Sequence, residues 1–214
     1  MRPTLGPSLK NAGKNFGKPS ALEPTRRLAK IDAPHLTNVY KRQRVFKLLD
    51  GHSKARVIWV SAPPGYGKTL AVSSWLQTRR KRLIWYQCDE GDADPASFFY
   101  FLTLALADHT GSTADTMPSL SPELYSALPI FVRNYFREFC ARLKAPTFLV
   151  LDNWQDVPTN APLRELLPVM MEQIPAGIVL MPISREEPPA NLARLAYSWG
   201  RARRHSHPPG PPAS

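Results

Sequence analysis

The chain has 214 residues, 43% of them hydrophobic, and a formal net charge of +11. This length and apolar fraction allow one domain with a sizeable core and appended tails. Two cysteines, Cys88 and Cys140, are too few for a disulfide framework and indicate buried thiols in a reducing, cytoplasmic setting. No apolar run approaches the ~20 residues that a membrane span needs, and the basic, polar start is not typical of a secretory signal.

The positive charge is concentrated at the two ends. Residues 1–56 hold 13 Lys and Arg against 3 Asp and Glu, residues 57–184 hold 10 against 12, and residues 185–214 hold 5 against 2. Residues 1–34 are rich in Pro, Gly, Ser, Asn and Lys, and are predicted to be a disordered basic leader. Such an end can attract nucleic acid non-specifically, although a solvated tail is the more common interpretation.

A short amphipathic helix is predicted next, because Val45, Leu48 and Leu49 share one helical face. Gly51 provides a stop for this helix. Arg42 stands at its start, just before the segment that carries the main motif of the chain. Two interpretations of Arg42 stay open, a contact with a bound nucleotide and a place on a solvated basic face.

Residues 57–69 read Val-Ile-Trp-Val-Ser-Ala-Pro-Pro-Gly-Tyr-Gly-Lys-Thr and contain the most informative motif. The apolar, β-branched run at 57–60 predicts a buried strand. The eight residues that end in Gly-Lys-Thr follow the phosphate-loop pattern, with Ala62 where Gly is usual, and a helix is predicted from residue 68 to about 78. The predicted nucleotide-binding residues are those of the loop and the helix start, Ala62, Pro63, Pro64, Gly65, Tyr66, Gly67, Lys68, Thr69 and Leu70.

Each residue type of the loop has a physical role. Gly65 and Gly67 allow backbone conformations that point N–H groups at an anion, and the helix N-terminus adds a partial positive charge. Lys68 can reach the β- and γ-phosphates, and the Thr69 hydroxyl can ligate Mg²⁺. An ordinary Gly/Pro turn between a strand and a helix is the alternative.

A second strand is predicted at residues 83–88, followed by an acidic run. Ligands of open α/β sheets bind beyond the carboxyl ends of strands. Asp89 or Glu90 can therefore hold a water molecule or the outer shell of a metal ion at this end. Asp92 and Asp94 are instead predicted to form a turn and to cap the next helix.

Two helices are predicted between the second strand and the next one. The first begins at Pro95 and has a broad, aromatic apolar face, and the second is a strongly amphipathic stretch at residues 131–143. The aromatic residues indicate core packing rather than a base-stacking platform, because no basic residues alternate with them.

Residues 147–152, Thr-Phe-Leu-Val-Leu-Asp, match a Walker B strand, whose final carboxylate, Asp152, holds Mg²⁺ directly or through water. The distance of about 80 residues from the phosphate loop strengthens this assignment. Asn153 follows where many ATPases carry a Glu that polarises the attacking water. Because an amide cannot accept a proton, hydrolysis is predicted to be slow or absent, or to use another acid, for which Asp156, Glu90 and Asp89 are the candidates.

Residues 178–183 predict a further strand that ends at Ser184 and Arg185. Arg185 suits a sensor of the γ-phosphate, since its charge cannot be neutralised, and the alternative is a surface ion pair with a following Glu. Residues 196–214 are predicted to be a disordered Pro/Arg-rich tail. The catalytic candidates are therefore Lys68, Asp152, Arg185, Asp89 and Glu90, and the metal-holding candidates are Thr69 and Asp152.

These motifs together resemble the ATPase module of large MalT-like transcriptional activators of the LuxR superfamily. Four ordered segments carry the resemblance, which covers roughly residues 35–195: residues 59–69, residues 85–95, residues 149–153 and residues 183–185. The resemblance implies a STAND-type P-loop NTPase fold, a three-layer α/β sandwich with a mostly parallel sheet. It also implies ATP and Mg²⁺ as ligands, and a switch between resting and self-assembling states.

Two departures from that family shape the remaining expectations. The relatives continue through a winged-helix region, a helical-repeat sensor and a DNA-binding helix-turn-helix, none of which is in this chain. Their fifth core strand, beside the phosphate-loop strand, is expected to be missing here, which would leave four strands, an unpaired edge and a truncated domain at 35–195. We therefore expect an ATP-binding switch without its own DNA contacts, the alternatives being a free-standing phosphotransferase and an inactive remnant.

Overall fold

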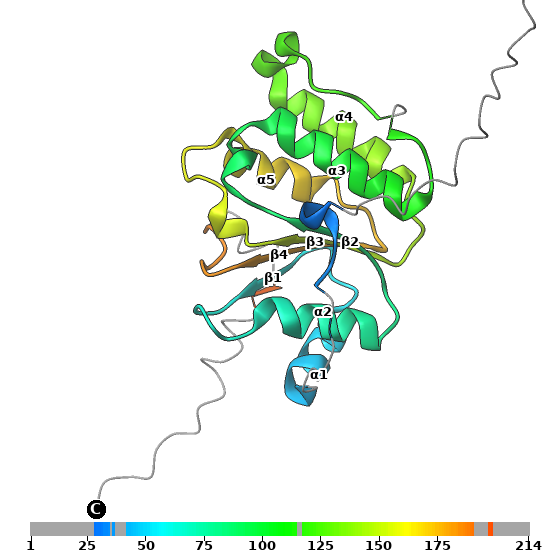
Figure 1. Ribbon diagram of the computed structural model, residues 1–214, viewed down its shortest axis with the longest axis vertical. Coiled ribbons are helices and arrows are strands. Elements are labelled where there is room, and N and C mark those ends of the chain that lie inside the picture. The colour runs from blue at the N-terminus through cyan, green and yellow to red at the C-terminus, as the bar shows by residue number, and fades with distance from the viewer. Residues whose placement is uncertain (1–27, 35, 37–41, 115–116, 191–196, 199–214) are drawn as a thin grey trace, which may run out of the picture.

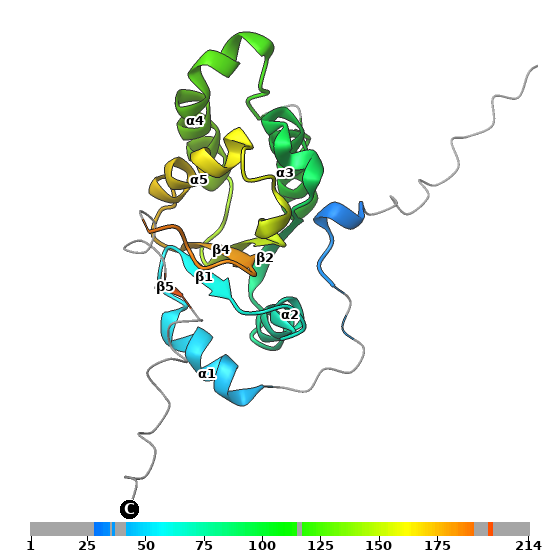
Figure 2. The ribbon, with the colours of Figure 1, turned by 90° about the vertical axis from the view of Figure 1, so that its left-hand side faces the viewer.

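The structure is a computed structural model, and it describes residues 28–34, 36, 42–114, 117–190 and 197–198. The predictions for the leader before residue 28 and for the tail after residue 198 lie outside these residues. The described part contains a parallel sheet between two layers of helices (Figures 1 and 2). The predicted three-layer α/β sandwich is therefore confirmed.

The middle layer is a sheet with the strand order β2-β3-β4-β1-β5, in which every pairing is parallel. Its four longer strands are β1 (Ile58–Ser61), β2 (Arg82–Gln87), β3 (Thr147–Asp152) and β4 (Ile178–Ser184). All residues of β1, β3 and β4 are buried. This is the reason why these strands are continuous apolar runs rather than alternating ones, since helices cover both faces.

The sheet divides the hydrophobic core into two clusters, one on each of its faces. Helices of the two outer layers cover these clusters. Helices α1 (Gln43–His52) and α2 (Lys68–Thr78) cover one face (Figure 2). Helices α3 (Pro95–Thr110), α4 (Leu128–Ala141) and α5 (Pro162–Glu172) cover the other. Short 3-10 turns connect these elements: η1 (Ala29–Ile31), η2 (Glu90–Ala93), η4 (Pro122–Ala127) and η5 (Trp154–Asp156).

A fifth strand corrects one expectation of the sequence. Strand β5 (Tyr197–Ser198) lies on the outer side of β1 and pairs with Ile58 and Trp59 in parallel. The expectation of a missing fifth strand is thus wrong at this position, although the strand is only two residues long. The physical reason is that the free edge of β1 offers unpaired backbone N–H and C=O groups, to which a passing segment can hydrogen-bond.

Residues 28–34, which we call the N-terminal strap, correct the predicted start of the ordered domain at residue 35. The strap passes the edge strand β2 (Figure 1): Ile31 packs on the core cluster under α3, and Ala33 packs on the cluster under α2. Lys30 forms ion pairs with Asp89 at 2.6 Å and with Asp92 at 3.1 Å. The composition of the strap is typical of a disordered tail. The strap is nevertheless held against the domain, because Lys30 pairs with the buried carboxylate of Asp92.

Asp94 caps α3, as the sequence predicts. Its carboxylate accepts hydrogen bonds from the backbone N–H groups of Ala96 at 3.1 Å and Ser97 at 3.2 Å, and from the Tyr125 hydroxyl at 2.6 Å. The hydrogen bond from Tyr125, followed by those from the two backbone groups, lowers the pKa of Asp94. The ionised side chain therefore compensates the partial positive charge at the start of α3.

The Asp94→Ala variant is expected to lose about 1 kcal/mol of unfolding free energy, the usual effect of removing an N-cap side chain. The folded-state pKa lies below that of the unfolded chain, so this contribution is present above the unfolded pKa of about 3.9 and is lost as pH falls through the folded value. Urea unfolding at pH 7 and pH 3 measures both effects. An Asp94→Asn variant keeps the acceptor but lacks the pH dependence, and a loss in Asp94→Ala that is equal at both pH values would contradict the assignment.

Candidate nucleotide-binding site

The loop between β1 and α2 has the backbone conformation that its sequence predicts. Gly65 has φ +77° and Gly67 has φ +65°, and Gly67 is the N-cap residue of α2. Positive φ values are adopted at little cost by Gly alone, which explains both positions. The loop lies at the carboxyl end of β1, and the side chain of Tyr66 is 43% exposed. The N-terminus of α2 therefore opens towards solvent through this loop.

Lys68 folds back over the same loop. Its Nζ atom donates hydrogen bonds to the carbonyl oxygen of Ala62 at 2.6 Å and to that of Pro63 at 3.2 Å. Burial lowers the pKa of Lys68, the positive charge of Arg185 lowers it further, and the negative charge of Asp152 opposes both effects. Two cations that repel each other across one space favour the binding of an anion between them, because an anion stabilises both charged forms.

Thr69 and Asp152 form the closest pair of predicted site residues. The Thr69 hydroxyl donates a hydrogen bond to Asp152 Oδ1 at 2.9 Å, and the backbone N–H of Asn153 donates to the same oxygen at 3.0 Å. Asp152 is buried at the end of β3, and burial raises its pKa, while these two hydrogen bonds and Lys68 oppose that rise. The fold thus brings together two oxygen ligands that are 83 residues apart in the sequence.

The Thr69 hydroxyl and the Asp152 carboxylate fit Mg²⁺ better than a metal ion whose ligands all come from the protein. Mg²⁺ is usually bound by one or two carboxylates and by substrate phosphates, and it keeps several of its water molecules. In the described part of the chain, no group of three or more His, Cys, Asp or Glu side chains could hold a metal ion. One carboxylate, Asp152, with one hydroxyl, Thr69, is the donor set expected for a metal ion that arrives with a nucleotide.

Arg185 follows β4 at the same edge of the sheet and has an exposed side chain. Its backbone lies beside the start of the phosphate loop, because Ser184 pairs with Ser61 in the parallel pairing of β4 and β1. Of the two glutamates that could pair with Arg185, Glu186 pairs instead with Arg164 at 2.7 Å. Arg185 thus lies at the end of β4, next to the phosphate loop.

Arg42 contacts the phosphate loop directly. Its Nη1 atom donates a hydrogen bond to the carbonyl oxygen of Tyr66 at 2.7 Å. A Cβ atom at Gly67 would lie 3.3 Å from Arg42 Nη2, so the guanidinium group also lies against the N-cap of α2. This hydrogen bond is made to the backbone of the loop, and Arg42 itself is exposed, so both interpretations of its role stay open. Leu70, at the start of α2, is 47% exposed beside this loop.

Asp89 and Glu90 do not join this site. The Asp89 side chain accepts a hydrogen bond from the backbone N–H of Gly91 at 2.9 Å and pairs with Lys30, so it caps η2. Glu90 is exposed in the first turn of η2. Among the described residues, no hydrogen bond or ion pair joins either carboxylate to the phosphate loop or to Asp152. The sequence placed both residues correctly at the end of β2. However, Asp89 caps η2, and Glu90 is exposed to solvent.

The residues that sequence reasoning missed lie just beyond β3 and β4. Gln155 accepts a hydrogen bond from the backbone N–H of Arg185 at 3.0 Å. Arg164 donates to the carbonyl oxygens of Val157 at 2.8 Å and Gln155 at 3.2 Å, and its ion pair with Glu186 ties the two loops together. No spacing in the sequence predicts these contacts. The only available signal is the position of Gln155, three residues after the Walker B carboxylate, which indicates that it lies near the end of β3.

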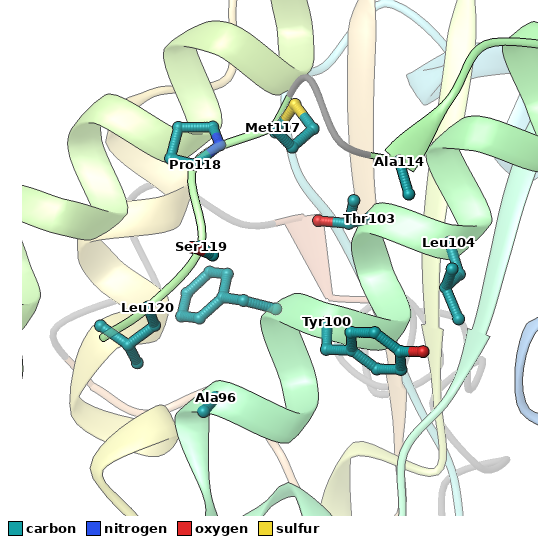
Figure 3. Close-up of a pocket in the computed structure, with 10 residues that line it drawn as sticks. Ala96, Tyr100, Thr103, Leu104, Ala114, Met117, Pro118, Ser119 and Leu120 are labelled. Atoms are coloured by element: carbon teal, nitrogen blue, oxygen red, sulfur yellow. The ribbon is translucent and has the colours of Figure 1, made fainter. Parts of the chain in front are cut away.

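A second hollow lies away from this site, between α3 and the loop that follows it (Figure 3). Its volume is about 500 Å³, and Tyr100, Thr103, Met117 and Leu120 are among the residues that line it. None of the described residues that line it is charged. A triphosphate needs cations and backbone N–H groups, which are found around Lys68 and not in this hollow.

The strand, loop and helix around Lys68, with the Thr69–Asp152 pair, define a nucleotide-binding P-loop domain. The chain is 30% identical over 169 residues to the HTH-type transcriptional regulator MalT of Cronobacter sakazakii. This match covers 78% of the chain and 18% of the length of that relative. The predicted resemblance is thereby confirmed, since most of the chain is similar to a part of MalT. No protein-family model matches the chain.

Two solved structures have a similar arrangement at low sequence identity. One contains Drosophila ORC bound to AT-rich DNA and Cdc6, with 11% identity, a TM-score of 0.44, and coverage of 73% of this chain and 55% of that chain. The other is C. elegans PCH-2, with 13% identity, a TM-score of 0.31, and coverage of 72% of this chain and 40% of that chain. Within the residues described, none of the helices has both the length and the apolar character needed to cross a bilayer.

Proposed function

We propose that the chain is a Mg²⁺-dependent ATP-binding switch module of a cytoplasmic, MalT-like transcriptional regulator, with slow or no ATP hydrolysis. The observation that carries this proposal is the hydrogen bond of 2.9 Å between Thr69 and Asp152, at the start of the helix that carries Lys68. It would join the two halves of the proposed Mg²⁺–triphosphate site, one at the start of α2 and the other at the end of β3.

The phosphates would bind at the N-terminus of α2, where backbone N–H groups and the ammonium of Lys68 provide positive charge. Lys68 would then exchange the carbonyl oxygens of Ala62 and Pro63 for phosphate oxygens. Thr69 and Asp152 would hold Mg²⁺, which when bound neutralises part of the phosphate charge. Arg185 would contact the γ-phosphate, and Arg42 would support the loop from its outer side.

Slow hydrolysis is proposed because the residue after the Walker B carboxylate Asp152 is an amide, Asn153. Asn153 stands in the left-handed conformation with φ +56°, and its amide oxygen accepts a hydrogen bond from Gln155 at 3.4 Å. An amide cannot take a proton from an attacking water molecule. Two of the candidate carboxylates, Asp89 and Asp156, already accept hydrogen bonds from their neighbours. We therefore propose that the domain reports bound ATP rather than turning it over rapidly.

The role in a regulator is proposed from the relative. MalT is an HTH-type transcriptional regulator, and this chain spans 18% of its length. Signal sensing and DNA binding would then belong to parts of a regulator outside the matched segment. ATP is proposed to shift the module from a resting state to a self-associating one. ATP would then bind the self-associating state more tightly, because a ligand shifts an equilibrium only through a difference in its affinity for the two states.

The metal assignment is tested by the Asp152→Asn variant. Saturating Mg²⁺ and ATP at about a hundredfold excess over Kd should stabilise the wild-type protein by about 2.7 kcal/mol, which a melting curve detects. In EDTA, we expect both proteins to bind ATP weakly and equally. On addition of Mg²⁺, affinity should rise in the wild type and stay unchanged in Asp152→Asn, because the amide lacks the negative charge that attracts the metal.

The matched control for this experiment is Asp108→Asn, which removes an exposed carboxylate on α3 and should keep the full response to Mg²⁺. A Mg²⁺ response of Asp152→Asn equal to that of the wild type would show that Asp152 does not hold the metal. Phosphorylated acceptor in place of intact bound ATP would favour a phosphotransferase.

A further inference from the structure

The strongest feature outside the motifs is a bridge made by the side chain of Gln155. This residue lies in η5, which follows Asp152 at the end of β3 and begins after its N-cap residue, Asn153. Its Oε1 atom accepts a hydrogen bond from the backbone N–H of Arg185 at 3.0 Å, across 30 residues of sequence. The bridge thus connects the end of β3 with the end of β4, beside the proposed triphosphate site.

The hydrogen-bond partners fix the orientation of the Gln155 amide. The backbone N–H of Arg185 can only donate, so the carbonyl oxygen of Gln155 must face it. On the other side, the Gln155 Nε2 atom donates to Asp156 Oδ1 at 3.1 Å and to Asn153 Oδ1 at 3.4 Å. Both halves of the amide are used, and reversing it would place two donors or two acceptors against each other.

The backbone around Arg185 is held by further contacts. The backbone N–H of Glu186 donates to the Ser184 hydroxyl at 3.1 Å, and the indole N–H of Trp59 donates to the Glu186 carbonyl oxygen at 2.9 Å. The carboxylate of Glu186 pairs with Arg164, which also donates to the carbonyl oxygens of Gln155 in η5 and of Val157 just after it. The polypeptide around Arg185 is therefore held in place, and the exposed side chain of Arg185 follows Ser184, which pairs with Ser61 just before the phosphate loop.

We propose that Gln155 is a positioning residue for Arg185, and that it thereby contributes to the preference of the module for ATP over ADP. Gln155 would touch no nucleotide. It would hold the backbone from which the guanidinium group reaches the γ-phosphate, and charge-assisted hydrogen bonds depend strongly on such geometry. This inference rests on the proposed ATP-binding function, and it assigns the discrimination between ATP and ADP to a pair of residues.

The test compares the affinities for ATP and ADP, both with Mg²⁺, by isothermal titration calorimetry. Arg185→Ala should lower the ATP-to-ADP affinity ratio by about tenfold or more, because it removes a hydrogen bond from a charged donor. Gln155→Met, which keeps the volume but removes both hydrogen-bonding atoms, should lower the ratio by about three- to tenfold and leave ADP affinity unchanged. The double variant should have a ratio no lower than that of Arg185→Ala, because both changes remove the same interaction.

Two further variants make the test specific. Gln155→Glu keeps an oxygen for the Arg185 N–H but turns a second acceptor towards Asp156, so its ratio should lie between those of the wild type and Gln155→Met. Gln77→Met, on the exposed part of α2, is the matched control and should change nothing. Should Gln155→Met fail to fold, Gln155→Asn replaces it, since its side chain is one methylene too short to reach Arg185.

The outcomes separate this inference from the proposed function. A wild-type ratio in Gln155→Met, together with a lowered ratio in Arg185→Ala, would overturn the inference alone. An equal loss of ATP and ADP affinity in Gln155→Met would also overturn it, because that result indicates a purely structural role. An unchanged ratio in Arg185→Ala would overturn both the inference and the proposed sensor role of Arg185. No ATP binding by the wild type would remove the proposed function itself.

Discussion

Lys68→Ala is expected to weaken ATP binding by about thirtyfold or more, which corresponds to about 2 kcal/mol or more for the loss of charge-assisted hydrogen bonds to the phosphates. The structure explains why the fold should survive this change. In the absence of nucleotide the ammonium group donates only to carbonyl oxygens of the exposed loop, at Ala62 and Pro63, where water can take its place. Titration calorimetry with Mg²⁺ and ATP measures the affinity, and a melting curve checks the fold.

The control for Lys68→Ala is Lys47→Ala, which removes the same charge from an exposed position on α1. It should bind ATP like the wild type, because an exposed charge farther than a Debye length of ~8 Å from a ligand is largely screened at physiological salt. Equal ATP affinity of Lys68→Ala and wild type would remove the nucleotide-binding proposal. The basic character of the chain would then be the only remaining source of affinity for anions.

Asp92→Ala should produce the largest loss of stability, about 3–5 kcal/mol, the range found when one partner of a buried ion pair is removed. Asp92 is completely buried and accepts hydrogen bonds from the Tyr86 hydroxyl at 2.6 Å and the backbone N–H of Asp89 at 2.9 Å. Its carboxylate also pairs with Lys30 of the strap at 3.1 Å. Burial raises the pKa of Tyr86, so this hydroxyl stays protonated and would be left without its acceptor.

The matched control for Asp92→Ala is Asp89→Ala, because both carboxylates pair with the same Lys30. The Asp89 side chain is 56% exposed, against 0% for Asp92, so solvent screens its ion pair and the loss should be at most about 1 kcal/mol. Urea unfolding of both variants gives the comparison. Asp92→Asn, which keeps an acceptor oxygen but not the charge, should lie between them, and a loss below about 1 kcal/mol in Asp92→Ala would contradict the role of the buried pair.

The sequence predicted the elements whose chemistry is local. The positive φ angles of Gly65 and Gly67 could be predicted from the residue type alone. The apolar run before Asp152 predicts a buried strand that ends in a carboxylate. The contact between Thr69 and Asp152 could also be anticipated, because parallel strands place their carboxyl ends at one edge of a sheet. Asp94 was recognised as a cap for the same kind of reason, since the following Pro95 marks a helix start.

The remaining features depend on contacts between distant segments, which no local pattern encodes. Lys30 meets Asp92 across 62 residues, and Gln155 meets Arg185 across 30. The role proposed for Asp89 failed because Lys30 and the N–H of Gly91 occupy its oxygen, and the partner lies in a stretch that composition assigns to disorder. Strand β5 was missed because two residues are too few to show any periodicity.

The strap has a practical consequence for anyone who shortens this protein. A version that starts at residue 35, the boundary that composition suggests, would lose Lys30 and leave the carboxylate of Asp92 inside the protein without its counter-ion. It would also uncover the flank of β2 and invite association between copies. Trimming should therefore stop before Leu28, and a recombinant module cut at residue 35 should precipitate or melt early even though every nucleotide-binding motif is intact.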